Sequence, residues 1–351
     1  MTTRIAINGF GRVGRQAFKI AAQYPELEVV AINDIGNVAN MAYLLRHDTV
    51  YRDDKSRIEV GDGTLIVDGK PYPVYAISDP LLLPWKDLKV DVVIESTGKF
   101  KTAEQAAAHL QAGAKTVMVS APSKGAKTVV LGINQHELAA EISQSTGARV
   151  FSNASCTTNS VAPVMSVLDE VFGVQKALMT TVHSYTGDQA LVDAPHKDFR
   201  RGRAAGQNIV PTSTGAARAT GLVLPALNGK FDGACLRVPT LDVSISDITV
   251  VTERQTTVDE VNAAFRNASE TTLNGYLGVT DEPLVSADFI GSEYSTVVDL
   301  SLTQVMGGDL VKVFAWYDNE WGYSHRLVEA VLLLGQALAQ ELALEPAMAG
   351  R

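Results

Sequence analysis

The first 150 residues alternate between short apolar runs and longer stretches in which apolar residues recur at helical spacing. The runs at residues 4–8, 27–33, 90–95, 115–120, 128–132 and 149–152 predict strands, and residues 15–23, 38–48, 103–111 and 135–141 predict helices between them. This alternation is typical of a doubly wound α/β domain with a parallel sheet. Runs at residues 57–60, 64–67 and 72–75, separated by Asp-Gly turns, predict a small antiparallel insertion.

The pattern changes after residue 155. A helix is predicted over residues 155–172 and a strand over 177–182, but the segment from 183 to about 220 has little periodicity and is interpreted as a long loop. Runs at residues 231–240 and 243–253 alternate strictly and, with runs near 295–298 and 310–316, predict a mostly antiparallel sheet. Helices are predicted over residues 258–268 and from Trp321 onward. The second half is therefore expected to be α+β.

Length and composition narrow the class of protein. A chain of 351 residues exceeds the roughly 250–300 residues at which one core stops growing, so we expect two domains, residues 1–154 and 155–320, with a helix of about 321–345 packing back onto the first. Hydrophobic residues make up 46% and charged residues 20%, which is ordinary for a folded soluble protein. The net charge of −9 argues against general nucleic-acid binding.

Location follows from similar arguments. No run approaches the roughly 20 apolar residues of a membrane span, so no membrane association is expected. Cys156 and Cys235 are the two cysteines, too few for a disulfide framework, and the N-terminus lacks a signal-peptide pattern. These features predict a cytoplasmic protein.

A glycine-rich turn follows the first predicted strand. It comprises Gly9, Phe10, Gly11, Arg12, Val13 and Gly14. Strand, GxGxxG turn and helix in this order are typical of a Rossmann-type dinucleotide site, where the pyrophosphate lies on the helix N-terminus. Asp34 ends the next strand at the distance expected of an acid that binds the adenosine ribose hydroxyls, although it could instead cap the following helix. Ser96, Thr97, Gly98 and Ser120 fall at predicted strand C-termini, where such folds bind ligands.

Cys156 lies among small hydroxylated residues directly before an apolar, helix-like run. The positive end of a helix dipole favours an anion, so we expect this position to lower the pKa of the thiol and make it a nucleophile. The alternative is that Cys156 is a small buried hydrophobe. His183 ends a core-like strand and begins the long loop of residues 183 to about 220, which is rich in arginine. This position makes it the best candidate for a base near the sulfur.

A nicotinamide cofactor together with a reactive cysteine indicates aldehyde oxidation through a thiohemiacetal and a thioester. The basic loop carries Arg200, Arg201 and Arg203 before a Thr-Ser-Thr-Gly segment, a combination that suits phosphate, although a solvated loop is the alternative. If the loop and a distant arginine such as Arg237 bind phosphate groups, inorganic phosphate could release the acyl group. No metal site is predicted.

Several segments carry a family resemblance. They are Ile7-Asn8-Gly9-Phe10-Gly11-Arg12, Ser152-Asn153-Ala154-Ser155-Cys156-Thr157-Thr158-Asn159, Thr181-Val182-His183, Pro211-Thr212-Ser213-Thr214-Gly215-Ala216-Ala217, Leu236-Arg237-Val238-Pro239-Thr240 and Trp316-Tyr317-Asp318-Asn319-Glu320. They closely resemble phosphorylating glyceraldehyde-3-phosphate dehydrogenases, in the same order and across nearly the whole chain. The resemblance implies a homotetramer that converts glyceraldehyde 3-phosphate, inorganic phosphate and NAD to 1,3-bisphosphoglycerate and NADH.

The resemblance also assigns roles to residues. Cys156 is the expected nucleophile and His183 the expected base. The attacking phosphate would be held by Ser155, Thr157, Thr214 and Gly215, and the substrate phosphate by Thr186, Arg201 and Arg237. Asn319 would orient the nicotinamide amide, Arg12 and Val13 would contact the cofactor through the turn, and the long loop would pack beside the cofactor of a neighbouring subunit. Which of Arg200, Arg201 and Arg203 binds the substrate is left open.

Departures from the family pattern are few. Ser160 replaces a second cysteine, Ser78 replaces an arginine of the adenine region, and Ala194-Pro195 mixes features of NADP-accepting and NAD-specific relatives. Asp34 and the apolar Ile35 favour NAD. The rival interpretations are an erythrose-4-phosphate dehydrogenase, a catalytically silent binding protein of the same fold, and a cysteine hydrolase or acyltransferase that uses no cofactor.

Overall fold

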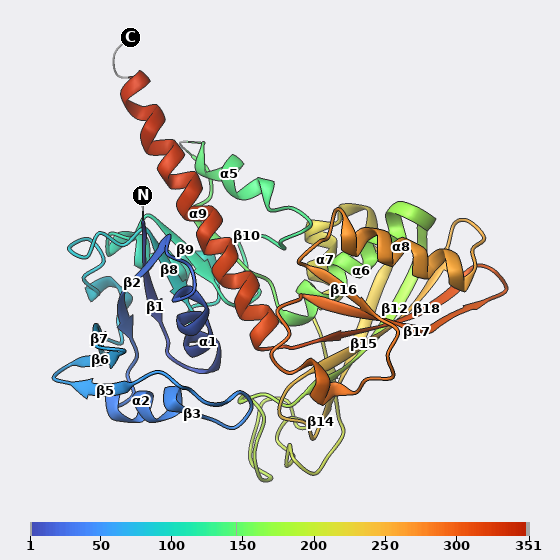
Figure 1. The fold of residues 1–351 in the computed structure, drawn as a ribbon, viewed down its shortest axis with the longest axis horizontal. Coiled ribbons are helices and arrows are strands. Elements are labelled where there is room, and N and C mark those ends of the chain that lie inside the picture. The colour runs from blue at the N-terminus through green and yellow to red at the C-terminus, as the bar shows by residue number, and fades with distance from the viewer. Residues whose placement is uncertain (1, 145, 349–351) are drawn as a thin grey trace. The chain divides into compact units, whose positions relative to one another are not determined.

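The computed structural model describes residues 2–144 and 146–348. The chain forms two compact units (Figure 1). The first unit is drawn from residues 1–129, 134–154 and 324–351, and the second from residues 130–133 and 155–323. Within the described part of the chain, no helix is both long enough and apolar enough to cross a membrane.

The first unit is built on a largely parallel sheet. Its strands are β1 (Thr3–Asn8), β2 (Leu27–Asn33), β5 (Ile58–Gly61), β6 (Thr64–Val67), β7 (Lys70–Tyr75), β8 (Val92–Glu95), β9 (Thr116–Val119), β10 (Lys127–Thr128) and β11 (Val150–Ser152). Their order is β10-β11-β9-β8-β1-β2-β7-β6-β5. The pairs from β10 to β7 are parallel, and β7-β6-β5 is the predicted antiparallel insertion, joined edge-on to β2. The strand predicted over 128–132 is wrong in length, because the ladder with β11 ends at Thr128.

The strands of this first sheet are apolar because its faces are covered. The helices are α1 (Arg12–Ala21), α2 (Val38–Arg46), α3 (Ala103–Ala106), α4 (Ala108–Gln111), α5 (His136–Ile142) and α9 (Trp321–Met348), with a short hairpin of β3 (His47–Asp48) and β4 (Arg52–Asp53) and a 3-10 turn, η1 (Pro80–Leu82). Helix α9 runs beside this sheet (Figure 1), and a Cβ at Gly335 would lie 2.0 Å from Oγ1 of Thr3. Arg149 pairs with Glu341 of α9 at 2.6 Å.

The second unit has the mostly antiparallel sheet that the sequence predicts. Its strands are β12 (Val174–Ser184), β13 (Val210–Ser213), β14 (Phe231–Val238), β15 (Ser244–Thr252), β16 (Leu277–Thr280), β17 (Thr296–Met306) and β18 (Leu310–Tyr317), in the order β13-β14-β12-β15-β18-β17-β16. Pairs β12–β14 and β16–β17 are parallel and the others are antiparallel. The parallel pair places His183 directly beside Arg237.

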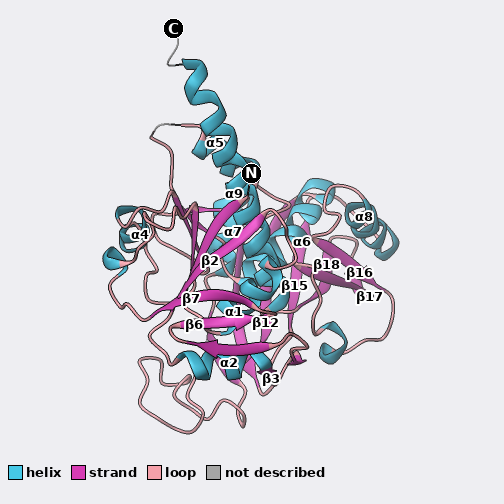
Figure 2. Ribbon diagram, turned by 60° about the vertical axis from the view of Figure 1, so that its left-hand side comes forward, coloured by secondary structure: helices cyan, strands magenta, loops and turns pink. Residues whose placement is uncertain are grey.

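Helices cover one face of this second sheet (Figure 2). They are α6 (Cys156–Phe172), α7 (Ala216–Val223) and α8 (Val258–Glu270), with the turns η2 (Pro225–Leu227) and η3 (Ser286–Phe289). Leu168 of α6 and Phe265 of α8 pack with Ile248 of β15 in a continuous core. On the opposite face of the sheet Leu178 is 67% exposed.

The loop predicted from residue 183 to about 220 is wrong in its last third, because it contains β13 and the start of α7. Helix α7 is a short run rich in alanine, threonine and glycine, so its apolar spacing is too weak to recognise in the sequence. It forms because Ala216 and Ala217 are buried in the core of the second unit. Strand β16, also missed, is only four residues long.

Candidate active site

The glycine-rich turn joins β1 to α1, and its three glycines have different surroundings. Gly9 has φ +97°, and a Cβ there would lie 2.6 Å from the backbone nitrogen of Thr97. A Cβ at Gly14 would lie 2.0 Å from the carbonyl oxygen of Gly9. Gly11, the N-cap of α1, has no described atom within 4 Å of an added Cβ. The turn is closed toward the protein and open at the helix N-terminus, which fits a pyrophosphate.

Asp34 follows β2 and lines a cavity of about 200 Å³. Its carboxylate accepts hydrogen bonds from the backbone nitrogens of Phe10, at 2.7 Å, and Gly36, at 2.8 Å. The alternative interpretation of Asp34 as the cap of the next helix is wrong, because Asn37 caps α2 and accepts a hydrogen bond from Ala39. Asp34 is therefore bonded to the glycine turn at the edge of a cavity.

The other predicted cofactor residues lie at the same end of the sheet. Gly9, Gly11, Ser96 and Thr97 line this cavity. The hydroxyl of Ser96 donates a hydrogen bond to the carbonyl oxygen of Gly9 at 2.7 Å, which links the ends of β8 and β1. Gly98 follows with φ +70°, and Ser120 follows β9, where its backbone nitrogen bonds to the carbonyl oxygen of Glu95 at 2.9 Å.

Arg12 is positioned by the protein itself. Its guanidinium pairs with Asp48 at 2.7 Å and lies over the ring of Tyr51. Burial opposes ionisation of Asp48, but the hydrogen bond and charge of Arg12 outweigh it and lower the pKa of this carboxyl. Arg12 and Val13 are the first two residues of α1.

In the second unit, Cys156 is the first residue of α6. Ser155 is the N-cap, and its hydroxyl oxygen accepts a hydrogen bond from the backbone nitrogen of Thr158 at 3.0 Å. The sulfur lies 3.3 Å from Nε2 of His183, which β12 presents from the adjacent sheet. Helix N-terminus and strand thus bring the two predicted catalytic residues into contact.

His183 is buried, and its second ring nitrogen determines which tautomer faces the sulfur. Nδ1 lies 2.6 Å from the carbonyl oxygen of Ser184, an acceptor, so Nδ1 carries the proton. Nε2 is then an unprotonated acceptor directed at the Cys156 thiol. This arrangement is the one that a general base requires.

The predicted lowering of the Cys156 pKa is wrong for this structure. Burial raises the pKa of the Cys156 thiol to about 11, although Arg237 and hydrogen bonds from Thr157 act in the opposite direction. Burial, assisted by the charge of Arg237, lowers the pKa of His183 to about 3. At Cys156 the loss of solvation in the packed site outweighs the charge of Arg237 and the hydrogen bonds of Thr157, so a neutral thiol facing a neutral imidazole is the favoured form.

Tyr317, which has no role predicted from the sequence, lies next to this pair. Its hydroxyl is 3.0 Å from Oγ1 of Thr157 and 2.8 Å from Oγ1 of Thr181, and its ring meets the ring of His183 edge-on at 6.0 Å. Thr157, expected to hold a phosphate, thus bonds to Tyr317 here. Burial raises the pKa of the Tyr317 phenol, so it stays protonated.

Thr186, Arg201 and Arg237 are joined through Asp188. Arg237 donates to Oγ1 of Thr186 at 2.8 Å, the hydroxyl of Thr186 donates to Asp188, and Arg201 pairs with Asp188 at 2.5 Å. Burial opposes ionisation of Asp188, but the bond from Thr186 and the charge of Arg201 outweigh it and lower its pKa. The buried Nε of Arg237 has no hydrogen-bond partner among the described residues. These groups form a preorganised cationic site suited to an anion.

The three candidate arginines are separated by their contacts. Arg201 belongs to the Asp188 cluster, whereas Arg203 pairs with Asp193 at the surface at 2.9 Å and Arg200 is exposed. Thr214 and Gly215 lie at the start of α7, where Oγ1 of Thr214 accepts a hydrogen bond from Ala216.

Asn319 follows β18 and is buried. Its Oδ1 accepts a hydrogen bond from the hydroxyl of Ser244 at 2.6 Å, and that hydroxyl oxygen accepts one from the backbone nitrogen of Ser184 at 3.2 Å. Because Ser184 also binds His183, Asn319 is linked to the base through two serines. Sequence reasoning missed Ser184 and Ser244, since serine in an alternating strand carries no signal of this contact.

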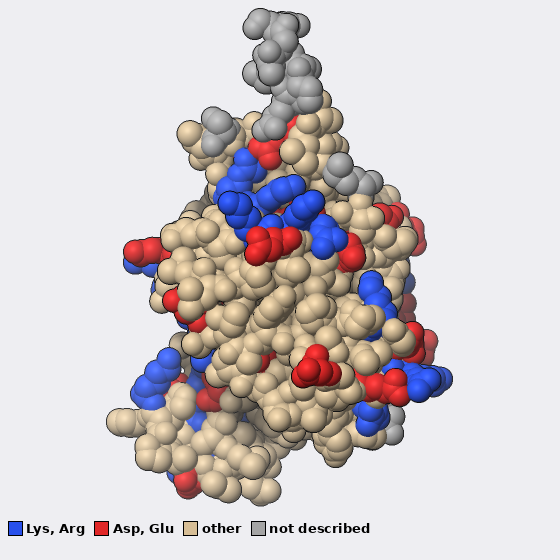
Figure 3. All heavy atoms as spheres, turned by 90° about the vertical axis from the view of Figure 1, so that its left-hand side faces the viewer, with Lys and Arg blue, Asp and Glu red and all other residues tan. Residues whose placement is uncertain are grey.

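Charge is mixed on the face of the molecule in Figure 3. Lys and Arg side chains lie among Asp and Glu side chains, with broad uncharged areas between them. Among the described residues of this face there is no continuous basic surface of the kind that nucleic-acid binding uses. In the described part of the chain, no group of three or more His, Cys, Asp or Glu side chains could hold a metal ion.

Comparisons with known proteins cover both units. The family described as "Glyceraldehyde 3-phosphate dehydrogenase, NAD binding domain" matches residues 3–103, and "Glyceraldehyde 3-phosphate dehydrogenase, C-terminal domain" matches residues 155–319. The glyceraldehyde-3-phosphate dehydrogenase of Thermotoga maritima is 52% identical over 334 residues, 94% of this chain and 98% of the relative. That of Geobacillus stearothermophilus is 48% identical over 330 residues, which cover 94% of this chain and 97% of the relative. The chloroplastic glyceraldehyde-3-phosphate dehydrogenase B of Pisum sativum is 51% identical over 337 residues, which cover 94% of this chain and 74% of the relative.

Proposed function

Because the chain belongs to the glyceraldehyde-3-phosphate dehydrogenase family, we propose that it oxidises glyceraldehyde 3-phosphate to 1,3-bisphosphoglycerate, with inorganic phosphate and reduction of NAD. The observation that carries this proposal is the contact of 3.3 Å between Sγ of Cys156 and the unprotonated Nε2 of His183. A thiol without a base would not be activated at this burial.

The chemistry proposed for these two residues conserves every proton. Nε2 of His183 takes the thiol proton as the sulfur of Cys156 bonds to the aldehyde carbon, and it returns that proton to the new hydroxyl oxygen of the thiohemiacetal. Bound NAD would supply the acceptor for the hydride whose departure converts the thiohemiacetal to a thioester. His183 accepts the hydroxyl proton in that step. Inorganic phosphate then attacks the thioester carbon and the Cys156 sulfur leaves. His183 returns its proton to that sulfur, which restores the thiol, and the proton of the attacking hydrogen phosphate goes to solvent.

Phosphate binding is assigned to the cationic site of the second unit. Thr186, Arg201 and Arg237 are proposed to hold the substrate phosphate, because they converge through Asp188 and the buried Nε of Arg237 has no hydrogen-bond acceptor among the residues that the structure describes. Ser155, Thr157, Thr214 and Gly215 are proposed to hold the attacking phosphate. The two helix N-termini of α6 and α7, which Ser155 and Gly215 cap, favour an anion there.

Cofactor binding is assigned to the first unit. The residues proposed to hold NAD are Gly9, Phe10, Gly11, Arg12, Val13, Gly14, Asp34, Ser96, Thr97, Gly98 and Ser120. The family resemblance adds Asn319 as the proposed partner of the nicotinamide amide. The carboxylate of Asp34 suits free ribose hydroxyls and would repel a 2′-phosphate. NAD is therefore the expected cofactor rather than NADP, despite Ala194-Pro195.

A homotetramer in the cytoplasm is also proposed. Apolar side chains remain exposed on the open face of the second sheet and along the loop after β12, including Leu178 at 67%, Phe199 at 90% and Leu191 at 79%. Such patches favour contacts between subunits. Analytical ultracentrifugation tests the tetramer: a monomer at micromolar concentration would contradict it. The cytoplasmic location rests on the sequence alone.

Initial-rate kinetics test the proposed reaction. We expect NADH production to depend on both glyceraldehyde 3-phosphate and inorganic phosphate, with a higher kcat/KM for NAD than for NADP. Faster, phosphate-independent turnover of erythrose 4-phosphate would favour the rival dehydrogenase. A Cys156→Ser variant with unchanged function would favour a catalytically silent binding protein, and absence of saturable NAD binding would favour a hydrolase.

A further inference from the structure

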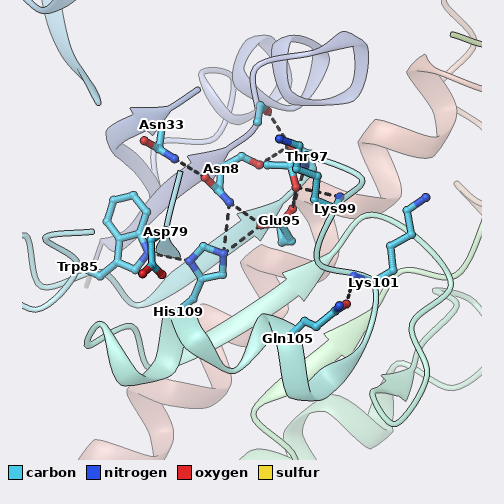
Figure 4. A network of polar contacts seen from close by, with 12 residues as sticks. Asn8, Asn33, Asp79, Trp85, Glu95, Thr97, Lys99, Lys101, Gln105 and His109 are labelled. Atoms are coloured by element: carbon cyan, nitrogen blue, oxygen red, sulfur yellow. Dashed lines mark hydrogen bonds and ion pairs between the residues drawn. The ribbon is translucent and has the colours of Figure 1, made fainter. Parts of the chain in front are cut away.

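Five buried side chains form a continuous polar network beneath the cavity of the first unit (Figure 4). They are Asn8, Asn33, Trp85, Glu95 and His109. Asn8 and Asn33 end β1 and β2 and line the cavity, whereas Glu95, His109 and Trp85 lie behind them. The proposed reaction assigns no role to these five residues.

The two asparagines connect three segments of the cavity wall. Asn33 donates to Oδ1 of Asn8 at 2.7 Å and to the carbonyl oxygen of Ile77 at 2.9 Å. Its own Oδ1 accepts a hydrogen bond from the backbone nitrogen of Ile77, also at 2.9 Å. The amide of Asn33 therefore fastens the segment after β7 to the ends of β1 and β2.

Glu95 collects the hydrogen bonds of the remaining members. Its Oε1 accepts from the backbone nitrogen of Thr97 at 2.9 Å and from the hydroxyl of Thr97. Its Oε2 accepts from Asn8 at 2.5 Å and lies 3.0 Å from Nε2 of His109. A carboxylate has about four acceptor sites, so these four donors saturate it. A buried carboxylate of this kind is tolerated only when its hydrogen bonds are complete.

The tautomer of His109 follows from its two neighbours. The indole nitrogen of Trp85 donates to Nδ1 of His109 at 3.0 Å, so Nδ1 is an acceptor and carries no proton. Nε2 is then the nitrogen that carries the proton in this tautomer, and it donates a hydrogen bond to Glu95. Nε2 of His109 and Nδ2 of Asn8 lie 3.3 Å apart because both donate to the same oxygen of Glu95, Oε2.

We propose that Glu95 and His109 are positioning residues for the dinucleotide site. Glu95 holds Thr97 with one oxygen and Asn8 with the other, and His109 orients Glu95 so that both contacts form together. Because Thr97, Asn8 and Asn33 line the cavity, the network determines its shape before the dinucleotide binds. This inference rests on the proposed function, since it concerns the same cofactor site.

Two substitutions at His109 separate its two hydrogen bonds. His109→Gln keeps a donor where Nε2 meets Glu95 and loses the acceptor for Trp85. His109→Asn keeps an acceptor where Nδ1 meets Trp85 and loses the donor to Glu95. Both remove a similar part of a buried ring, so a merely structural role predicts similar effects of the two.

The measurement is the Kd of NAD for the purified full-length protein by fluorescence titration, together with kcat and the KM of NAD. We expect His109→Asn to raise Kd and KM about tenfold, equivalent to about 1.4 kcal/mol, with kcat at saturating NAD unchanged. His109→Gln should stay within about threefold of the wild type. Equal Kd values for both variants, whether raised or unchanged, would overturn the inference.

A second variant covers the case in which neither substitution gives folded protein. Trp85→Phe keeps the aromatic packing but removes the donor that selects the His109 tautomer, so we expect Kd to rise about threefold with kcat unchanged. A wild-type Kd for Trp85→Phe would then overturn the inference. The proposed function is tested separately, because it fails if the wild-type protein does not bind NAD or does not oxidise glyceraldehyde 3-phosphate.

Discussion

Alanine substitutions at two glycines of the same turn are predicted to have different effects: Gly9→Ala should lower stability, and Gly11→Ala should weaken NAD binding. Gly9 has φ +97°, where an L side chain costs at least about 1–2 kcal/mol. Its Cβ would also lie 2.6 Å from the backbone nitrogen of Thr97 and 2.7 Å from the carbonyl carbon of Ser96, neither of which is a flexible side-chain end. Overpacking of this kind costs about 1–3 kcal/mol. We therefore expect Gly9→Ala to lower the free energy of unfolding by about 2–5 kcal/mol without any ligand.

Gly11 is the matched control. Its φ of −73° suits alanine, and an added Cβ meets no described atom within 4 Å. The cost of alanine at an N-cap that glycine occupied is about 1 kcal/mol or less. The space beside Gly11 is where the pyrophosphate is expected, so Gly11→Ala should raise the Kd of NAD by about tenfold or more while the fold stays nearly as stable.

Urea unfolding in the absence of NAD and fluorescence titration with NAD distinguish the two effects. Gly9→Ala should shift the unfolding midpoint, and Gly11→Ala should mainly shift the binding curve. Two results would contradict this prediction: a Gly9→Ala variant with the same urea unfolding midpoint as the wild type, or a Gly11→Ala variant as strongly destabilised as Gly9→Ala.

Three further predictions concern the second unit. His183→Asn removes the acceptor that faces the thiol, so kcat should fall about 10²–10⁴-fold while the Kd of NAD stays unchanged. Steady-state rates and fluorescence titration measure these two quantities, and an unchanged kcat would contradict the role of His183 as a base. Arg201→Leu should raise the KM of glyceraldehyde 3-phosphate about tenfold or more, since a charged hydrogen bond contributes about 1.5–3 kcal/mol. Arg203→Leu should leave this KM unchanged. Equal KM values for the two variants in initial-rate measurements would refute the assignment of Arg201 to the substrate phosphate. Burial and the neighbouring Asp318 raise the pKa of Asp242 to about 9, against about 3.9 in an unfolded chain, so its contribution to stability is present below about pH 4 and is lost as the pH rises toward 9. Between about pH 5 and pH 8, the free energy of unfolding of Asp242→Asn should therefore rise relative to that of the wild type. Urea unfolding at several pH values measures this, and a difference between the two proteins that does not change with pH would contradict it.

Much of the fold could be predicted because its signals are local. Apolar periodicity located β1, α1 and β2, and the glycine turn between them follows from backbone sterics at a few adjacent residues. The same information is weak where an element is short or held only by distant packing. Strand β16 and helix α7 were missed for this reason.

The candidate site divides along similar lines. Cys156 and His183 could be chosen from the sequence because each lies at the boundary of a recognisable helix or strand, and the structure places them in contact. Tyr317 could not, because its role as a neighbour of both depends on the pairing of β18 with β15 and of β15 with β12. The contact of Arg201 with Asp188 likewise depends on how the loop after β12 folds.

The sequence by itself determined the order of elements, the glycine turn, the acid at the end of β2 and the choice of Cys156 and His183 as candidate thiol and candidate base, because these depend on neighbours along the chain. Only the tertiary structure decided which arginine joins Thr186, which tautomer of His183 faces the sulfur, and that Glu95 receives bonds from β1 and α4. It also reversed the expected pKa shift of Cys156. Strand register and desolvation arise from groups far apart in the chain, and no local pattern carries them.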